Sequence, residues 1–142
     1  MGRAIALDVG TKTIGVALSD PLGITANPVC TVTRQGVKKD VLALMELTVG
    51  KDVDTLVVGL PLELDGSETR SAKLARQVGE AFGEALGLKP VYIDERYSSV
   101  EAERALIEAD LSRKKRKGVI DQAAAVIILR SYLDHVDWSG LS

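Results

Sequence analysis

Three acidic residues stand at the ends of apolar segments that are far apart in the chain: Asp8, Glu95 and Asp121. A carboxylate in such a setting is costly to remove from water unless it is paired, hydrogen-bonded or bound to a metal ion. Carboxylates gathered in one site repel each other unless cations lie between them, and their hard oxygen atoms suit Mg²⁺ or Mn²⁺. Two such ions can activate a water molecule and stabilise the leaving oxygen of a phosphodiester. We therefore treat all three acids as candidate catalytic and metal-binding residues of a phosphodiester hydrolase.

Two of these acids also have structural explanations when each is taken alone. Asp8 could accept backbone N–H bonds in a turn or lie at the wet edge of a sheet. Asp121 could be a helix N-cap or a first-turn acid that the helix dipole favours. The coincidence of three acids, each at the end of an element and on an apolar face, favours a shared site.

The opening segment predicts a β-hairpin that positions Asp8. Two short apolar runs, Ala4–Val9 and Ile14–Leu18, flank the turn sequence at 10–13, which is the pattern of two strands joined by a tight loop. Because side chains alternate along a strand, Asp8 shares a face with the small alanines of the first run. The four-residue loop then sets Asp8 opposite Gly15.

After a third strand, the chain alternates between helix and strand signals. The expected segments are a strand at 27–33, a helix at 37–49, a strand at 55–59, a helix at 67–86 with Ser67 as its N-cap, a strand at 90–94, a helix at 99–110 and a final helix at 120–135. Three antiparallel strands followed by this alternation predict an α/β fold with a mixed five-stranded sheet and helices on both faces. If the first and last strands are parallel, Asp8 and Glu95 emerge at the same edge of the sheet.

The final helix is expected to bring Asp121 to that sheet. Counted from Asp121, the residues at the helical spacings i+3, i+4, i+7 and i+8 are Ala124, Ala125, Ile128 and Leu129. This apolar stripe should pack on the sheet, so that Asp121 heads an inward-facing column.

A basic segment just before Asp121 suits a phosphate backbone. It is an unbroken run of five cations: Arg113, Lys114, Lys115, Arg116 and Lys117. Clustered cations beside metal-holding acids fit a nucleic-acid binder whose affinity falls as salt rises, although a solvated loop would also explain the charges. Thr11, Lys12 and Arg96 are further candidate nucleic-acid contacts, although turn chemistry explains Thr11 and Lys12 equally well and Arg96 could instead pair with a neighbouring carboxylate. Aromatic residues are only 4% of the chain, which disfavours a base-stacking platform for single strands.

Length and composition limit the remaining choices. A chain of 142 residues with 46% hydrophobic content can form one core, and we expect a single domain over 1–138 with a frayed tail at 139–142. The net charge of −2 gives no global sign of a nucleic-acid binder, so that role must rest on local patches. A single cysteine excludes an internal disulfide, and no apolar stretch has membrane length or the pattern of a signal peptide. The cytoplasm is therefore the expected location.

Four segments form an ordered signature: DVGTKTIGVALSD at 8–20, VGLPLELDGSET at 58–69, DERYSSVEAE at 94–103 and GVIDQAAAVIIL at 118–129. This signature resembles the YqgF family of bacterial proteins, also called RuvX. The resemblance implies an RNase H-like fold and a divalent-metal nuclease, similar to Holliday junction resolvases, that matures the 5′ end of 16S ribosomal RNA. It also implies that the acidic positions of the family fall on Asp8, Glu95 and Asp121. After Asp-Glu-Arg, the sequence Tyr97-Ser98-Ser99 replaces the usual Leu-Thr-Thr, a difference that bears on substrate preference more than on catalysis.

The sequence leaves several functions open. The leading hypothesis is an endonuclease that processes the 16S rRNA precursor with two metal ions. Its nearest alternative keeps this chemistry but cuts four-way DNA junctions, for which a two-fold homodimer is the candidate assembly. A non-catalytic RNA-binding or ribosome-assembly factor would not depend on Asp8. A nucleotide phosphotransferase is the last alternative, because Asp-x-Gly-Thr in an initial hairpin also occurs in actin-like and sugar kinases, which close two lobes over the nucleotide.

Overall fold

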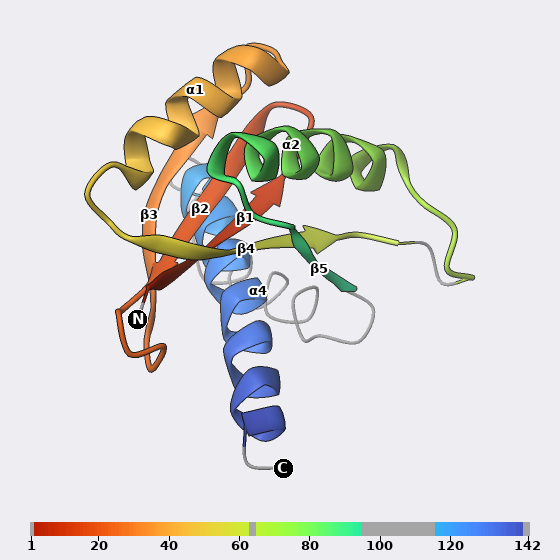
Figure 1. Cartoon of the computed structure of the whole chain (residues 1–142). Coiled ribbons are helices and arrows are strands. Elements are labelled where there is room, and N and C mark those ends of the chain that lie inside the picture. The colour runs from red at the N-terminus through yellow and green to blue at the C-terminus, as the bar shows by residue number, and fades with distance from the viewer. Residues whose placement is uncertain (1, 63–64, 95–115, 141–142) are drawn as a thin grey trace.

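A mixed five-stranded sheet forms the centre of the protein (Figure 1). The computed structural model describes residues 2–62, 65–94 and 116–140, with the side chains of the last segment only at 122–134. The strands are β1 Arg3–Val9, β2 Thr13–Ser19, β3 Ala26–Thr33, β4 Val53–Leu60 and β5 Val91–Asp94, in the spatial order β3-β2-β1-β4-β5. β1, β2 and β3 pair antiparallel, whereas β4 lies parallel to β1 and β5 parallel to β4. The predicted sheet is confirmed.

Helices cover both faces of this sheet, as the sequence predicts. α1 Val37–Thr48 and α2 Arg70–Leu86 lie on one face, and α4 Arg116–Gly140 lies on the other (Figure 1). The helix predicted over 99–110 lies outside the described residues. None of the helices in the parts of the chain that the structure describes is long and apolar enough to cross a membrane.

The two faces of the sheet differ in the size of the side chains that β1 contributes. On the α1 and α2 face, Ile5 and Leu7 of β1 are buried in one core with Leu44 and Phe82 from the helices. On the α4 face the sheet contributes mainly alanines, and these are buried with two alanines of the helix: Ala4, Ala6, Ala17, Ala124 and Ala125. Small residues on both surfaces allow a helix to approach a sheet closely. Asp8 continues the alanine face of β1, because side chains alternate along the strand.

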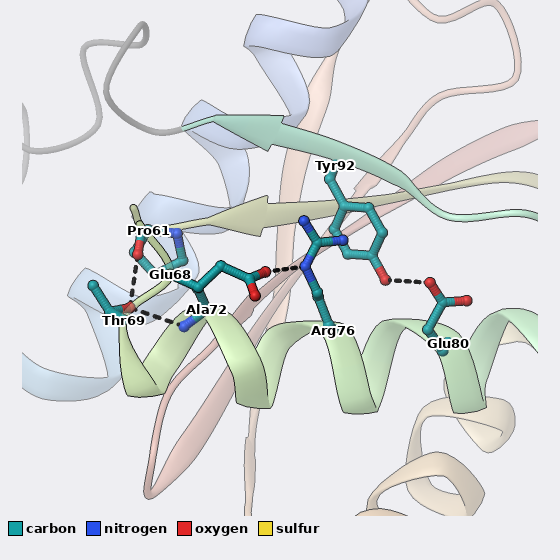
Figure 2. A network of polar contacts seen from close by, with 7 residues as sticks. All are labelled: Pro61, Glu68, Thr69, Ala72, Arg76, Glu80 and Tyr92. Atoms are coloured by element: carbon teal, nitrogen blue, oxygen red, sulfur yellow. Dashed lines mark hydrogen bonds and ion pairs between the residues drawn. The ribbon is translucent and has the colours of Figure 1, made fainter. Parts of the chain in front are cut away.

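The N-cap of α2 differs from the prediction. Thr69, not Ser67, caps the helix: its Oγ1 accepts a hydrogen bond from Ala72 N (2.9 Å) and donates one to the Pro61 carbonyl (2.7 Å) (Figure 2). The Ser67 backbone N and Oγ both donate to Asp65 Oδ1, at 2.9 and 2.7 Å. Ser67 is therefore part of the turn before the helix, and the prediction of a Ser67 cap was wrong.

The last helix is longer than the predicted 120–135. α4 begins at Arg116 and runs to Gly140, so its backbone includes Ser139 and Gly140 of the expected tail. The helix includes Gly118, and an interior glycine costs about 1 kcal/mol relative to alanine.

Candidate functional site

Asp8 lies near the carboxyl end of β1, on the face that α4 covers. Its partner across the β1–β2 pair is Gly15, and the partner of Gly15 across the β2–β3 pair is Thr31. Directly opposed residues share a face, so these three residues form a row across the sheet. Gly15 contributes no side chain between Asp8 and Thr31, and Asp8 itself is partly exposed. The predicted register of the hairpin is confirmed.

The start of α4 lies over this row. Gln122 Nε2 donates a hydrogen bond to Thr31 Oγ1 at 3.2 Å, and α4 packs across β1, β2 and β3. The stripe that the sequence assigns to the sheet side is fully buried there: Ala124, Ala125, Ile128 and Leu129. The backbone of Asp121, one residue before Gln122, therefore stands at the same end of the sheet as Asp8.

The longer α4 also decides between explanations of Asp121. The helix begins at Arg116 and carries no acid in its first turn, so Asp121 stands in the second turn. It is neither an N-cap nor a first-turn acid, and both structural alternatives are wrong. Its side chain lies outside the described part of the chain, and its place in a metal site stays a prediction.

The third acid follows β5. β5 is parallel to β4 and β4 to β1, so the carboxyl ends of these strands meet at one edge, which we call the carboxyl edge. Asp94 pairs with Leu60 at this edge, and Ile93 packs in the core under α4. The parallel orientation of the first and last strands, on which the prediction of a shared edge depended, is confirmed. Glu95, the residue after Asp94, lies outside the described residues.

A buried ion pair fixes the β1–β2 loop that follows Asp8. Arg34, just after β3, donates from Nε to Asp40 Oδ2 of α1 at 2.9 Å and from Nη1 to the Gly10 carbonyl at 3.2 Å. Arg34 N also donates to the Lys12 carbonyl at 2.9 Å. The side chains of Arg34 and Asp40 are only 11% and 1% exposed. These contacts join the loop, the end of β3 and the start of α1 into one unit.

Comparison with known proteins places this geometry in a family. The family model described as "RuvX: Holliday junction resolvase" matches residues 2–135. The chain belongs to this family. A RuvX relative in Moorella thermoacetica is 48% identical, and the match covers 98% of this chain and 99% of the relative. A relative in Myxococcus xanthus is 47% identical over 93% of this chain and 87% of its own length. Both carry the name "putative pre-16S rRNA nuclease".

Solved structures support the fold of this RuvX-family chain. Thermus thermophilus RuvC, in a complex with a Holliday junction substrate, matches with a TM-score of 0.56 at 13% identity and covers 96% of both chains. The fowlpox virus Holliday junction resolvase also matches with a TM-score of 0.56 at 13% identity, over 94% of this chain and 99% of that one. The fold is therefore RNase H-like, as the resemblance implied, within a family of nucleases.

The remaining predicted contacts of the RuvX chain divide into three groups. Thr11 and Lys12 are exposed in the β1–β2 loop at the carboxyl edge. Arg116 and Lys117 belong to the backbone of the first turn of α4. Arg96 and the cations at 113–115 lie outside the described residues. None of these nucleic-acid contacts is tested by the structure, and they stay predictions.

The donor chemistry of the predicted metal site fits Mg²⁺ or Mn²⁺, since all three candidates are carboxylates. Asp8 is the only one of them whose side chain the structure describes, and that side chain is partly exposed. Within the described ranges, no three residues of the kinds His, Cys, Asp or Glu lie close enough to hold a metal. The metal site is therefore carried forward as part of the proposal.

A polar network anchors β5 on α2 (Figure 2). Arg76 of α2 pairs with Glu68 and lies over the Tyr92 ring, 4.9 Å from its centroid, while Tyr92 Oη donates to Glu80 at 3.0 Å. Burial, followed by the bond to Glu80, raises the pKa of Tyr92 to about 12. The bond to Glu68 raises the pKa of Arg76. The network holds the strand that leads into Glu95.

Sequence reasoning missed several residues that shape this edge. Asp40 carried a signal, because it lies four residues before the core residue Leu44 and thus on the buried side of α1. Its partner Arg34 carried none, since strand ends commonly bear exposed cations. Thr31 and Gln122 could be placed only once the register of β3 and the packing of α4 were known.

Proposed function

We propose that this RuvX-family protein is a metal-dependent endonuclease that hydrolyses phosphodiester bonds in structured nucleic acid. We further propose that its substrate is the 16S rRNA precursor, cut at the 5′ end in the cytoplasm. The observation that supports the proposal is the position of Asp8 at the carboxyl edge, in the same row of the sheet as Thr31, which Gln122 of α4 contacts. β5 ends at the same edge. The family and the names of the relatives support the substrate class.

In this proposal, Asp8, Glu95 and Asp121 hold two Mg²⁺ or Mn²⁺ ions. The ions would supply Lewis-acid stabilisation of the charge that develops at the scissile phosphate. The chain itself would bind and orient the substrate: Lys12, Arg96 and the basic run at 113–117 neutralise flanking phosphates, and Thr11 offers a hydroxyl to them. The Arg34–Asp40 pair keeps the loop that carries Thr11 and Lys12 in place.

A second candidate function is resolution of four-way DNA junctions. The description of the family model favours it. Paired cuts in a four-way junction require two active sites related by a two-fold axis, so this function predicts a homodimer in solution. Size-exclusion chromatography with light scattering, in the presence and absence of a junction, would measure this assembly.

The deciding experiment compares the wild-type chain with Asp8→Asn on precursor rRNA and on a four-way DNA junction, with Mg²⁺, Mn²⁺ or EDTA. Losing several kcal/mol of transition-state stabilisation should slow cleavage at least about 100-fold in Asp8→Asn, while RNA binding is retained. Asp134→Asn is the matched control, because Asp134 is an exposed acid on α4 that lies far from the candidate site. Its neighbour Leu133 lies close to Gly23, in the turn at the opposite edge of the sheet.

The outcomes separate the functions. Metal-dependent cleavage of the precursor by wild type and Asp134→Asn, but not by Asp8→Asn, supports the proposal. Cleavage of the junction alone would replace it with the second function. RNA binding without cleavage under any metal would contradict both and indicate a non-catalytic factor.

A further inference from the structure

A second group of cations lies at the carboxyl edge, on the side of the sheet away from α4. Its members are Lys12 in the β1–β2 loop and Lys38 and Lys39 in the first turn of α1, and all three are exposed. We propose that these lysines form one phosphate-binding surface, the α1 lysine surface, which holds the backbone of the nucleic-acid substrate beyond Asp8. The inference rests on the proposed function and adds Lys38 and Lys39 to the residues that contact the substrate.

The topology puts the start of α1 beside the β1–β2 loop. β3 is antiparallel to β2, which is antiparallel to β1, so β3 ends at the same edge as β1. α1 begins at Val37, four residues after the end of β3. The hydrogen bonds from Arg34 to the carbonyls of Gly10 and Lys12, and its ion pair with Asp40 of α1, lock these two segments together. The three lysines therefore occupy one continuous part of the surface.

The charges on this surface are of one sign. Asp40 is the one acid in the first turn of α1, and it is buried and engaged by Arg34 and by Gln35 N at 2.8 Å. None of the three lysines forms an ion pair with any other residue in the part of the chain that the structure describes. Unpaired, exposed cations gathered beside a candidate phosphodiester site attract a polyanion and release its counterions on binding.

The opposite edge of the sheet shows a different arrangement. Lys51 lies there, because its carbonyl accepts a bond from Arg3 at the start of β1, and Lys89 lies there because it precedes β5. Both are exposed lysines, but Lys51 is followed by the exposed acids Asp52 and Asp54. This edge therefore has mixed charge, and its two lysines provide controls of the same residue type.

The test measures RNA binding rather than cleavage. All variants are made in the full chain with Asp8→Asn, so that the precursor RNA stays intact, and the dissociation constant is measured by fluorescence anisotropy over a series of KCl concentrations. The paired variants are Lys38→Ala/Lys39→Ala, Lys38→Arg/Lys39→Arg and, as control, Lys51→Ala/Lys89→Ala. Circular dichroism and thermal melts verify that each variant is folded.

We expect the Lys38→Ala/Lys39→Ala pair to reduce the slope of log affinity against log salt by about 1.4 on single-stranded RNA and about 1.8 on duplex. If the two contacts contribute nothing at about 1 M salt, the affinity at about 0.1 M should fall about 25-fold on single-stranded RNA and about 60-fold on duplex. The arginine pair, which keeps both charges, and the Lys51/Lys89 control should keep the parental slope.

Two results would overturn the inference. One is an unchanged slope in the Lys38/Lys39 alanine pair. The other is an equal loss in the Lys51/Lys89 pair, because this would reflect net charge alone. Failure of the proposed function looks different: the parental chain would then bind neither precursor RNA nor a junction, or the wild type would bind but cut neither.

Discussion

The buried ion pair between Arg34 and Asp40 gives the sharpest stability prediction. Asp40 is 1% exposed and has two charge-stabilising partners, Arg34 Nε and Gln35 N. Replacing Arg34 with methionine preserves much of the apolar stem but removes the guanidinium, leaving the carboxylate buried with one neutral donor. Breaking a buried pair by removing one partner costs about 3–5 kcal/mol. We therefore expect Arg34→Met to lower the free energy of unfolding by this amount.

The assay is urea unfolding followed by circular dichroism, together with a thermal melt. For a chain of this size, a loss of about 3–5 kcal/mol corresponds to a fall in Tm of roughly 10–20 °C. The double variant Arg34→Met/Asp40→Leu should recover a large part of the loss, because the uncompensated buried charge is gone. A double-mutant cycle with Asp40→Leu then yields the coupling energy between the two side chains.

Two outcomes would refute this reasoning. If Arg34→Met lowers the free energy of unfolding by less than about 1 kcal/mol, the ion pair behaves like a solvent-exposed one. The pair would then not be buried between β3 and α1 in solution. If the double variant is no more stable than Arg34→Met, the loss comes from the missing bond to the Gly10 carbonyl and not from the charge on Asp40.

Two further predictions concern the network around α2 and β5. Ultraviolet titration should find the pKa of Tyr92 near 12, and Glu80→Gln should lower it without restoring the ordinary value of 10.0, because burial remains the larger cause. Since the pKa of Tyr92 is higher in the folded than in the unfolded chain, the contribution of its protonated form to stability is complete below pH 10 and is lost as the pH rises towards 12. A free energy of unfolding that does not decline in this pH window would contradict the prediction. Thr69→Ala should lower the free energy of unfolding by about 1 kcal/mol because it removes the N-cap of α2. Ser67→Ala should change it by no more than about 0.5 kcal/mol. Urea unfolding that ranks the two variants in the reverse order would refute the Thr69 cap.

The hairpin and the order of the sheet could be predicted because both depend on local rules. A four-residue loop fixes the register of two strands, and alternation then fixes the face of every side chain, including Asp8. Short connections force β2 and β3 to be antiparallel, and right-handed crossovers leave few places for β4 and β5. The buried stripe of α4 follows from helical spacing in the same way.

The missed features depend on contacts between segments that are distant in the sequence. By residue type Ser67 is at least as good a cap as Thr69. Thr69 caps the helix, and its hydroxyl also reaches the Pro61 carbonyl. α4 starts at Arg116 and runs through Gly118, a residue that lowers the local helix propensity. The Arg34–Asp40 pair joins a strand end to the buried side of a helix, and only the folded chain shows that these two charges meet.

The division of side-chain size between the two faces explains why the candidate site lies where it does. The large side chains on the α1 and α2 face, such as Phe82, bury much apolar area and supply most of the stability of a core. On the α4 face β1 contributes Ala4 and Ala6, which keep the helix close to the sheet along this strand. Asp8 stands where this alanine row reaches the carboxyl edge, and Asp121 stands one turn before the alanines of α4. The same close packing that seats the helix thus brings the backbone of Asp121 to the end of the sheet where Asp8 stands.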